Sequence, residues 1–340
     1  MKKFVLIDGN AIIHRAYHSI PKNFTNRKGE KINAVYGFAM TLIKVLEDLK
    51  PEFLAASFDL AGPTFRHKEY KEYKATRVKA DQDLYDQIPR IKELVERLGV
   101  PIYEKEGFEA DDCLGTITSK IQDTRNKDTN KNQSKLAKNI SGDDLDTYIV
   151  SGDKDIFQLI NGRVKVYNLR KGLSQTQIVD KKYVEKEYDL QPEDFIDLKA
   201  LAGDSSDNIP GVPGIGQVTA TKLLQKFDTL EKLYKIIDNG PDLKLEDIKP
   251  RILKLLIENK KQAFLSQRLA TIKRDVPIDF KLEDCAWDEY HRGKLHEALK
   301  ELGFQSLLRR FDSSKSGEIK KARNEDKTET ENKDSQPRLL

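Results

Sequence analysis

The chain has 340 residues, with 60 lysines and arginines against 56 aspartates and glutamates, and a formal net charge of +4. This length is enough for two or three domains. No apolar run approaches the roughly 18 residues that a membrane-spanning helix needs, and the run at 4–7 is too short for a signal peptide. The two cysteines are far apart, which argues against a disulfide framework and a cysteine-rich zinc site and favours a cytoplasmic protein.

Strand-like and helix-like segments alternate along the first half of the chain. Apolar runs rich in β-branched and aromatic residues predict strands, and apolar residues three or four positions apart predict helices. The expected strands are 4–7, 53–58, 100–103, 148–150 and 164–169, and the expected helices are 34–49, 84–98 and about 107–121. Asp8-Gly9-Asn10 is typical of a turn after the first strand. The alternation predicts an α/β domain with a doubly wound, mainly parallel sheet over residues 1–182.

From about residue 183 the pattern is almost wholly helical, so residues 183–312 are expected to form a second domain. Two stretches hold too few apolar side chains to form a core of their own. Residues 122–146 are therefore expected to be a polar insertion, and residues 313–340 a disordered, charged tail.

Acidic residues follow several of the expected strands. Asp8, Asp59 and Asp153 each come after an apolar run, and the carboxyl ends of parallel strands form the ligand crevice of an open sheet. Further acids cluster at 109–112, 153–155 and 204–207. The nine candidates are Asp8, Asp59, Glu109, Asp111, Asp112, Asp153, Asp155, Asp204 and Asp207.

Taken singly, each of these acids is accounted for as an ordinary solvated side chain, or as one that interacts favourably with the dipole at a helix N-terminus. Brought together, however, they could not all stay ionised without cations. Oxygen ligands select hard divalent ions, so Mg²⁺ or Mn²⁺ is expected. The acids are numerous enough for two ions, and two ions about 4 Å apart suit in-line attack on a phosphodiester.

A basic segment with interleaved aromatic residues spans 65–80. Six basic side chains stand there against Glu69 and Glu72, giving a local net charge of +4: Arg66, Lys68, Lys71, Lys74, Arg77 and Lys79. With Phe65, Tyr70 and Tyr73 between them, this pattern suits single-stranded nucleic acid. A solvated helix face with internal ion pairs would have the same composition. The position shortly after Asp59 favours the nucleic-acid interpretation.

A glycine-rich turn precedes the apolar helical run 219–227. Gly211, Gly214 and Gly216 are expected to expose backbone N–H groups at a helix start, which would suit a DNA phosphate, with Lys222 nearby. Gln217 and Val218 stand where a P-loop needs lysine and serine or threonine. An ordinary connection between two helices remains the alternative.

Together these segments resemble the 5′-nuclease (flap endonuclease) family, and most closely the 5′-3′ exonuclease domain of bacterial DNA polymerase I. The matching motifs are F-V-L-I-D-G-N at 4–10, F-D at 58–59, F-R-x-x-x-Y-K-x-Y-K-x-x-R at 65–77, G-F-E-A-D-D at 107–112, S-G-D-K-D at 151–155 and G-D-S-S-D-N-I-P-G-V-P-G-I-G at 203–216. The resemblance covers about residues 3–311. It implies a PIN-like sheet, a helical arch over the active site at about 65–100, and a helix-three-turn-helix motif at 203–227 that holds duplex DNA with the help of a K⁺ ion.

The resemblance also implies roles for individual residues. The first metal site would use Asp8, Asp59, Glu109 and Asp111, with Asp112 close by or between the ions, and the second would use Asp153, Asp155, Asp204 and Asp207. Lys74 would reach the scissile phosphate, Tyr73 would stack on the substrate, and Arg15 and Arg77 would contact phosphates. The expected catalytic residues are therefore Lys74, Asp8, Asp59 and Asp112.

The chain departs from the family pattern at a few positions. The family usually has an aromatic residue at His14 and a lysine at Val218, and the stretch 122–146 is longer than usual. The loss of the lysine is expected to weaken one duplex phosphate contact. No polymerase region follows in this sequence, so a separate DNA polymerase is expected as a partner.

The sequence thus predicts a monomeric, nucleoid-associated hydrolase that cleaves DNA with 5′ flaps, nicks or RNA primers during replication and repair. Two alternatives come from other classes. A PIN-type metal-dependent ribonuclease shares acids at strand ends, and a non-catalytic protein that binds DNA structures would leave the acids merely solvated.

Overall fold

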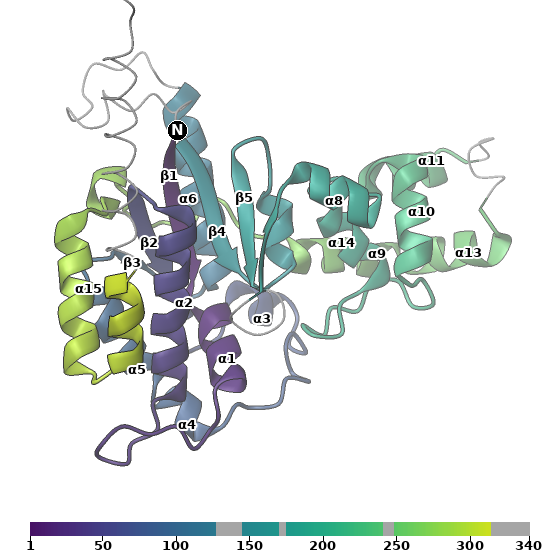
Figure 1. Ribbon diagram of the computed structural model, residues 1–340. Coiled ribbons are helices and arrows are strands. Elements are labelled where there is room, and N and C mark those ends of the chain that lie inside the picture. The colour runs from purple at the N-terminus through teal and green to yellow at the C-terminus, as the bar shows by residue number, and fades with distance from the viewer. Residues whose placement is uncertain (127–144, 170–174, 241–247, 314–340) are drawn as a thin grey trace, which may run out of the picture.

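The computed structural model describes residues 1–126, 145–169, 175–240 and 248–313 (Figure 1). Its centre is a six-stranded sheet in the order β3-β2-β1-β4-β5-β6. The strands are β1 (Lys2–Asp8), β2 (Phe53–Ser57), β3 (Ile102–Tyr103), β4 (Leu145–Ser151), β5 (Val164–Leu169) and β6 (Thr176–Val179). The first five run parallel, and β6 pairs antiparallel with β5. The predicted mainly parallel sheet is confirmed, whereas β6 was not expected.

The central strands are apolar on both faces because helices cover both sides of the sheet. Phe4 and Leu6 of β1 face one apolar cluster, and Val5 and Ile7 face another. The register pairs Asp8, the last residue of β1, with Ser57 at the end of β2. The carboxyl ends of β1, β2 and β4 therefore meet at one edge of the sheet.

Two helical layers enclose the sheet. One face packs against α1 (Gly9–Ser19), α2 (Asn33–Leu49), α5 (Ile88–Arg97) and α15 (Glu289–Glu301). The other face packs against α6 (Ala110–Asn126), the short 3₁₀ helix η2 (Asp155–Leu159) and the segment 272–285, which includes η3 (Leu282–Cys285). The core is thus a three-layer sandwich with its functional edge at the strand ends.

A separate helical lobe lies to one side of the sheet (Figure 1). It consists of α8 (Lys181–Tyr188), α9 (Asp194–Ala202), α10 (Gln217–Phe227), α11 (Leu230–Asp238), α13 (Pro250–Glu258) and α14 (Lys260–Ala270). The helices α9, α10, α11, α13 and α14 share an apolar cluster of their own around Leu201, Leu224 and Tyr234, whereas α8 buries Val184 in a cluster of the sheet. The lobe therefore has an independent core.

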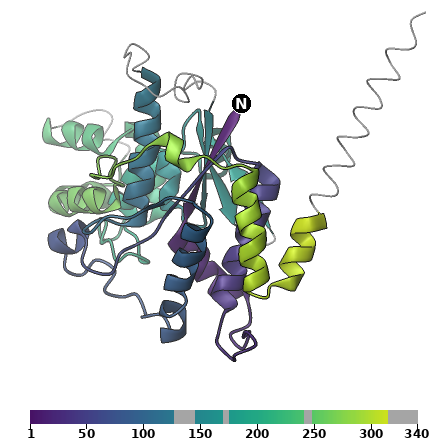
Figure 2. The same ribbon diagram turned by 90° about the vertical axis from the view of Figure 1, so that its left-hand side faces the viewer.

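The predicted domain of residues 183–312 is too long at its C-terminal end. After α14 the chain returns to the sheet, where Ile272 and Val276 join one apolar cluster and Trp287 and Leu295 join the other. Figure 2 shows α15, in yellow-green, on the same side of the sheet as α2. Both regions have a helical pattern, so periodicity alone could not separate the lobe from this returning segment.

Two further expectations need correction. Asp8-Gly9-Asn10 is not a turn: α1 begins at Gly9, and the Asp8 carboxylate caps it by accepting the Ala11 N–H at 3.0 Å. The expected arch at 65–100 contains only α3 (Phe65–Glu69) and α4 (Gln82–Tyr85) before α5. Because Ile91 and Leu94 bury the α5 face in the core, α5 belongs to the sandwich.

The expected insertion 122–146 begins inside α6 and ends inside β4, and its residues 127–144 lie outside the described part of the chain. The same is true of residues 314–340 of the expected tail. Among the described residues, the model contains no helix whose length and apolar character would let it span a membrane.

Candidate active site

A cavity of about 220 Å³ lies at the carboxyl edge of the sheet, and we call it the acidic cavity. It brings together five of the nine predicted acids and two of the predicted basic residues. They are Asp8, Asp59, Glu109, Asp111 and Asp153, with Lys74 and Arg77. Acids from four separate regions of the chain thus meet where the strand-end argument placed them.

Hydrogen bonds from distant parts of the chain fix the acids at the ends of β1 and β2. The Asp8 carboxylate accepts the Ser151 hydroxyl at 2.6 Å, which ties the end of β1 to the end of β4. Asp59 accepts the Ala110 N–H at 2.7 Å, and its own N–H donates to the Asn10 side chain at 3.0 Å. Ser151 and Asn10 are therefore positioning residues that were not predicted, although both lie inside motifs that the sequence singled out.

Crowding among these carboxylates disfavours their ionised forms. Burial raises the pKa of Asp8 to about 7, and the neighbouring Asp153 and Asp59 contribute to the rise. Burial and the charges of Asp8 and Asp153 likewise hold the pKa of Asp111 well above its ordinary value. A hard divalent cation would relieve this repulsion, and an all-oxygen donor set suits one. The residues present therefore fit such an ion chemically.

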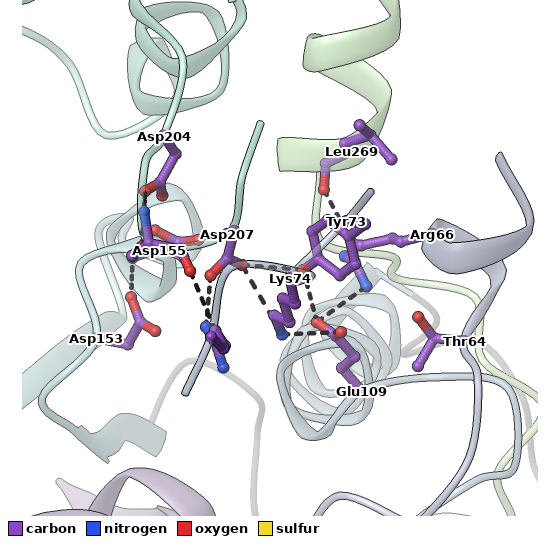
Figure 3. A network of polar contacts seen from close by, with 12 residues as sticks. Thr64, Arg66, Tyr73, Lys74, Glu109, Asp153, Asp155, Asp204, Asp207 and Leu269 are labelled. Atoms are coloured by element: carbon purple, nitrogen blue, oxygen red, sulfur yellow. Dashed lines mark hydrogen bonds and ion pairs between the residues drawn. The ribbon is translucent and has the colours of Figure 1, made fainter. Parts of the chain in front are cut away.

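Lysine side chains lie between carboxylates at the site. No group of three or more His, Cys, Asp or Glu within the described ranges has an arrangement ready to hold a metal ion. The Lys74 ammonium lies 2.8 Å from Glu109 Oε1 and 3.8 Å from Asp207 Oδ2 (Figure 3). Its backbone N–H also donates to the Asp207 carbonyl at 2.9 Å. Lys74 thus links the acidic cavity to the turn at 203–216.

Tyr73 does not present its ring to a substrate in this structure. Its side chain is 3 % exposed, and its hydroxyl lies 3.1 Å from Glu109 Oε2 and 2.9 Å from Asp207 Oδ2. The predicted stacking role does not fit this burial. Tyr73 instead supports the two carboxylates that Lys74 also contacts.

Arg66 and Asp112 are also corrected, because both are buried away from the cavity. Arg66 is 3 % exposed, and its guanidinium contacts both Asp112 oxygens at 2.8 Å. The same oxygens accept the N–H groups of Glu109 at 3.0 Å and Lys273 at 2.8 Å. Arg66 is therefore not placed to contact DNA, and Asp112 is not placed to bind a metal ion. The pair holds Glu109 in position instead.

A second acidic group lies next to the first. The Lys199 ammonium forms ion pairs with both Asp155 and Asp204, and the Asp155 N–H donates to Asp153 at 2.9 Å. Burial and the charge of Asp153 raise the pKa of Asp155 to about 7. Burial also acts on Asp204, but Lys199 and Ser206 outweigh it and lower its pKa to about 2.

Lys199 is a site residue that the sequence interpretation missed. The signal available was weak: a lysine in the last turn of α9, five residues before Asp204. The remaining acid, Asp207, pairs with Arg77 and Lys74 rather than with this second group.

A larger cavity of about 900 Å³, the lobe-side cavity, extends from the acidic cavity toward the helical lobe. Ala11, His14 and Asp153 line both cavities. Arg15, Lys154, Lys199 and Gln217 are among the other lining residues. The structure thus connects Arg15, a predicted phosphate contact, to the start of α10.

The glycine turn is only partly as predicted. Gly214 and Gly216 are exposed just before α10, and Lys222 is exposed on that helix. Gly211 is buried, and its N–H donates to the Ser266 hydroxyl at 3.0 Å. Gly211 is therefore a packing residue with no N–H to offer a phosphate. Val218, where the family usually has lysine, is 72 % exposed.

Comparison with known proteins identifies both parts of the chain. Residues 3–130 match the family model of the 5′-3′ exonuclease N-terminal resolvase-like domain, and residues 190–293 match that of the 5′-3′ exonuclease C-terminal SAM fold. The chain is 41 % identical to DNA polymerase I of Bacillus subtilis over 310 residues, which is 91 % of this chain and 32 % of that protein. It is 38 % identical to DNA polymerase I of Bacillus caldotenax over 94 % of this chain and 33 % of that protein. The chain thus spans about a third of the length of these relatives.

Solved structures share the fold at low sequence identity. A bacteriophage T5 5′-exonuclease with bound divalent metal ions aligns with a TM-score of 0.58 and 18 % identity, covering 93 % of this chain and 98 % of that chain. A complex of the T5 flap endonuclease with DNA and metal ions gives 0.60 and 19 %, covering 93 % and 97 %. The catalytic core of Rad2 with a DNA substrate gives 0.52 and 16 %, covering 88 % and 87 %.

The resemblance predicted from the motifs is confirmed by these matches. The two family models follow one another along the chain and together match more than half of it. Their order agrees with the structure, in which the sheet domain precedes the helical lobe. The chain belongs to the 5′-3′ exonuclease family.

Proposed function

We propose that this protein hydrolyses phosphodiester bonds near the 5′ ends of nicked or flapped DNA and that it requires divalent cations to do so. The acidic cavity is the observation that carries the proposal: it gathers Asp8, Asp59, Glu109, Asp111 and Asp153 around a lysine ammonium and an arginine. Such a set of oxygen ligands beside fixed positive charge suits phosphodiester hydrolysis.

Divalent ions would neutralise the carboxylates, activate water and stabilise the leaving oxygen. Mg²⁺ or Mn²⁺ is the expected ion, with two per site. Asp8, Asp59, Glu109 and Asp111 would hold the first, and Asp153, Asp155 and Asp204 the second. The Lys199 ammonium, which pairs with Asp155 and Asp204 in this structure, would either stay beside the second ion or move away when that ion binds.

The protein's own side chains would orient the phosphodiester. Lys74 and Arg77 line the acidic cavity, where their charges would offset the repulsion between carboxylates and DNA phosphate. Arg15 in the lobe-side cavity, with Gly214, Gly216 and Lys222 beyond it, would contact the duplex. A separate polymerase is the proposed partner that fills the gaps left by cleavage.

The test is cleavage of a 5′-labelled double-flap DNA with Mg²⁺ at about 5 mM, a concentration suited to a weakly held hydrated ion, and again with EDTA. We expect Mg²⁺-dependent cuts near the flap junction. Asp153→Ala should abolish cleavage while flap binding persists. An Asp279→Ala variant, which changes an exposed acid that lines neither the acidic cavity nor the lobe-side cavity, serves as the matched control.

A single-stranded RNA of the same length separates the alternatives. Degradation of the RNA with the flap DNA left intact would favour the PIN-type ribonuclease. Binding of both without turnover would favour a non-catalytic DNA-structure-binding protein. Either result would overturn the proposal.

A further inference from the structure

Two short turns from distant parts of the chain are joined by hydrogen bonds beside the acidic cavity. The first, which we call the lysine turn, spans residues 72–75 and is closed by the Ala75 N–H, which donates to the Glu72 carbonyl at 3.0 Å. The second, which we call the lobe turn, spans residues 204–209 between α9 and α10. Two backbone hydrogen bonds of 2.8 Å between its end residues close it. The lysine turn carries Lys74 at the acidic cavity.

The backbone of Lys74 is strained. Its φ of +56° lies in the left-handed region, and Lys74 occupies the third position of the turn, where a positive φ usually calls for glycine or asparagine. Among the described residues, five residues other than glycine have a positive φ. Three of these, Lys50, Asp189 and Asp228, are the C-caps of helices. The other two are Lys74 and Asn208, and neither ends a helix.

The lobe turn holds the lysine turn by its backbone. The Lys74 N–H donates to the Asp207 carbonyl at 2.9 Å, and the side-chain amide of Asn208 donates to the Glu72 carbonyl at 2.6 Å. These two hydrogen bonds use the N–H of the strained residue and the carbonyl that closes the turn around it. A strained backbone persists only where surrounding contacts maintain it. The lobe turn therefore stabilises a conformation that the lysine turn alone disfavours.

This conformation determines where the Lys74 ammonium lies. The ammonium is 2.8 Å from Glu109 Oε1 and 3.8 Å from Asp207 Oδ2 (Figure 3). Glycine would adopt the same backbone more easily but would carry no ammonium. Because the side chain leaves the backbone at the strained residue, a relaxed φ would direct the ammonium away from these two carboxylates.

Asn208 is the part of this contact that can be tested separately. Asp207 also interacts with Tyr73 and Arg77, so a change there would disturb several groups at once. Asn208 is half-buried and lines neither the acidic cavity nor the lobe-side cavity. Within the part of the chain that the structure describes, its side chain makes a single hydrogen bond, to the Glu72 carbonyl. None of the roles proposed above uses Asn208.

We propose that Asn208 is a positioning residue: it holds the lysine turn through the Glu72 carbonyl and thereby keeps the Lys74 ammonium at the acidic cavity. The inference rests on the proposed function for the part that this ammonium takes in cleavage. It makes the lobe turn, rather than the basic segment itself, the structure that sets the position of Lys74.

The principal variant is Asn208→Gly, which keeps a left-handed backbone accessible and removes the amide. If this variant does not fold, Asn208→Asp replaces it, because aspartate tolerates the same backbone but cannot donate to the Glu72 carbonyl. The matched control is Asn259→Ala. It removes another half-buried amide that donates to a carbonyl, that of Leu255 at 2.8 Å, and Asn259 lines neither cavity. Thermal melting checks that each variant is folded.

The first measurement is the single-turnover rate on 5′-flap DNA with Mg²⁺. We expect Asn208→Gly to lose about tenfold in rate, because a small displacement of a group that acts on the transition state is costly. Flap affinity in EDTA should stay close to that of the wild type. In a Lys74→Met background the loss should shrink to less than about twofold, because residues that act through one another are not additive.

The second measurement does not depend on activity. The metal-free protein is acetylated with an N-hydroxysuccinimide ester, and the modified lysines are quantified by peptide mass spectrometry. The half-buried Lys74 ammonium, paired with Glu109, should react slowly in the wild type and several-fold faster in Asn208→Gly. The exposed Lys71 should react equally in both proteins. Asn259→Ala should match the wild type in rate and in acetylation of Lys74.

A loss of the same size in the Lys74→Met background would show that Asn208 acts on something other than Lys74. Unchanged acetylation of Lys74 would show that Asn208 does not hold the lysine turn. Either result would overturn the proposal. If the wild type does not cleave flap DNA, the proposed function is wrong, while the acetylation measurement still decides whether Asn208 positions Lys74.

Discussion

Arg66 and Asp112 form a bidentate ion pair in the interior, with each of two guanidinium nitrogens 2.8 Å from one carboxylate oxygen. Arg66 also donates to the carbonyls of Leu269 and Thr271, both at 2.9 Å. The pair therefore joins three parts of the chain: the basic segment, the start of α6 and the end of the helical lobe. Because Asp112 also accepts the Glu109 N–H, this junction sets the position of an acid in the cavity.

Removing one member of this pair should destabilise the fold strongly. Arg66→Met leaves the Asp112 charge buried without its partner, and we expect a loss of about 3–5 kcal/mol in the free energy of unfolding, measured by urea denaturation. Lys232→Met, which breaks an exposed pair with Asp228, should cost less than about 1 kcal/mol. A loss below about 1 kcal/mol for Arg66→Met would mean that the buried pair contributes no more than an exposed pair does.

Lys74→Met should slow cleavage while leaving DNA binding largely intact. The ammonium stands between Glu109 and Asp207, where its charge would stabilise the transition state of phosphodiester cleavage. Loss of one such group typically costs about 100-fold or more in kcat. The control is Lys71→Met, three residues earlier and exposed. Single-turnover rates and flap affinity are the measurements, and an unchanged rate would remove Lys74 from the chemistry.

The stability of the metal-free protein should fall as pH rises from about 4 to 7. Burial raises the folded-state pKa of Asp8 to about 7, far above its value in the unfolded chain. The folded state therefore holds a proton that the unfolded state releases, and ionising Asp8 above pH 7 works against folding. Divalent cations should reverse this trend, because they favour the ionised carboxylates.

The corresponding measurement is thermal melting at pH 5 and pH 8, with and without Mg²⁺. Added cation should stabilise the protein more at pH 8, by about 2.7 kcal/mol when its concentration is 100 times the dissociation constant. Asp8→Asn should flatten the pH dependence. Equal stabilisation at both pH values would contradict the assignment of these carboxylates to a cation.

Gly211→Ala should be severely destabilising. Gly211 has φ +60°, and a Cβ there would lie 2.2 Å from the Gly203 nitrogen, a backbone atom that cannot move aside. We expect a loss of at least about 2 kcal/mol, from the left-handed conformation and the overlap together. Gly303→Ala, with φ +74° and no atom within 4 Å, isolates the conformational part. Comparable losses in the two variants would mean that the overlap relaxes.

Local sequence patterns predicted the sheet from its apolar runs. They predicted most of the acidic cavity from the acids that stand at the ends of those runs. Asp8 and Asp59 follow apolar strands, and a parallel sheet must bring such positions to the same edge. The helix α1 could also have been found, since Ile12, Ile13, Ala16 and Tyr17 repeat at helical spacing. The interpretation of Asp8-Gly9-Asn10 as a turn overlooked Asp8 as a helix cap.

Long-range contacts explain what the sequence could not show. Asp112 stands beside Asp111 in the chain, but only tertiary structure turns Asp112 toward Arg66, 46 residues away. Lys199 looks like any lysine on a helix until folding brings Asp155 to it. The same holds for residues 287–311, whose helical pattern does not reveal which surface they cover.

The return of the chain to the sheet also constrains the order in which the protein can fold during synthesis. The Trp287 N–H donates to the Glu52 carbonyl at 2.9 Å, and Leu295, Phe304 and Phe311 complete an apolar cluster that α2 begins. On the ribosome, the helical lobe has all residues of its apolar cluster once α14 has emerged. The sheet is synthesised earlier, but at that stage it still lacks the apolar side chains of residues 287–311 that pack on one of its faces. The N-terminal half therefore finishes folding last, and a nascent chain arrested before residue 287 should expose apolar surface of α2 to chaperones.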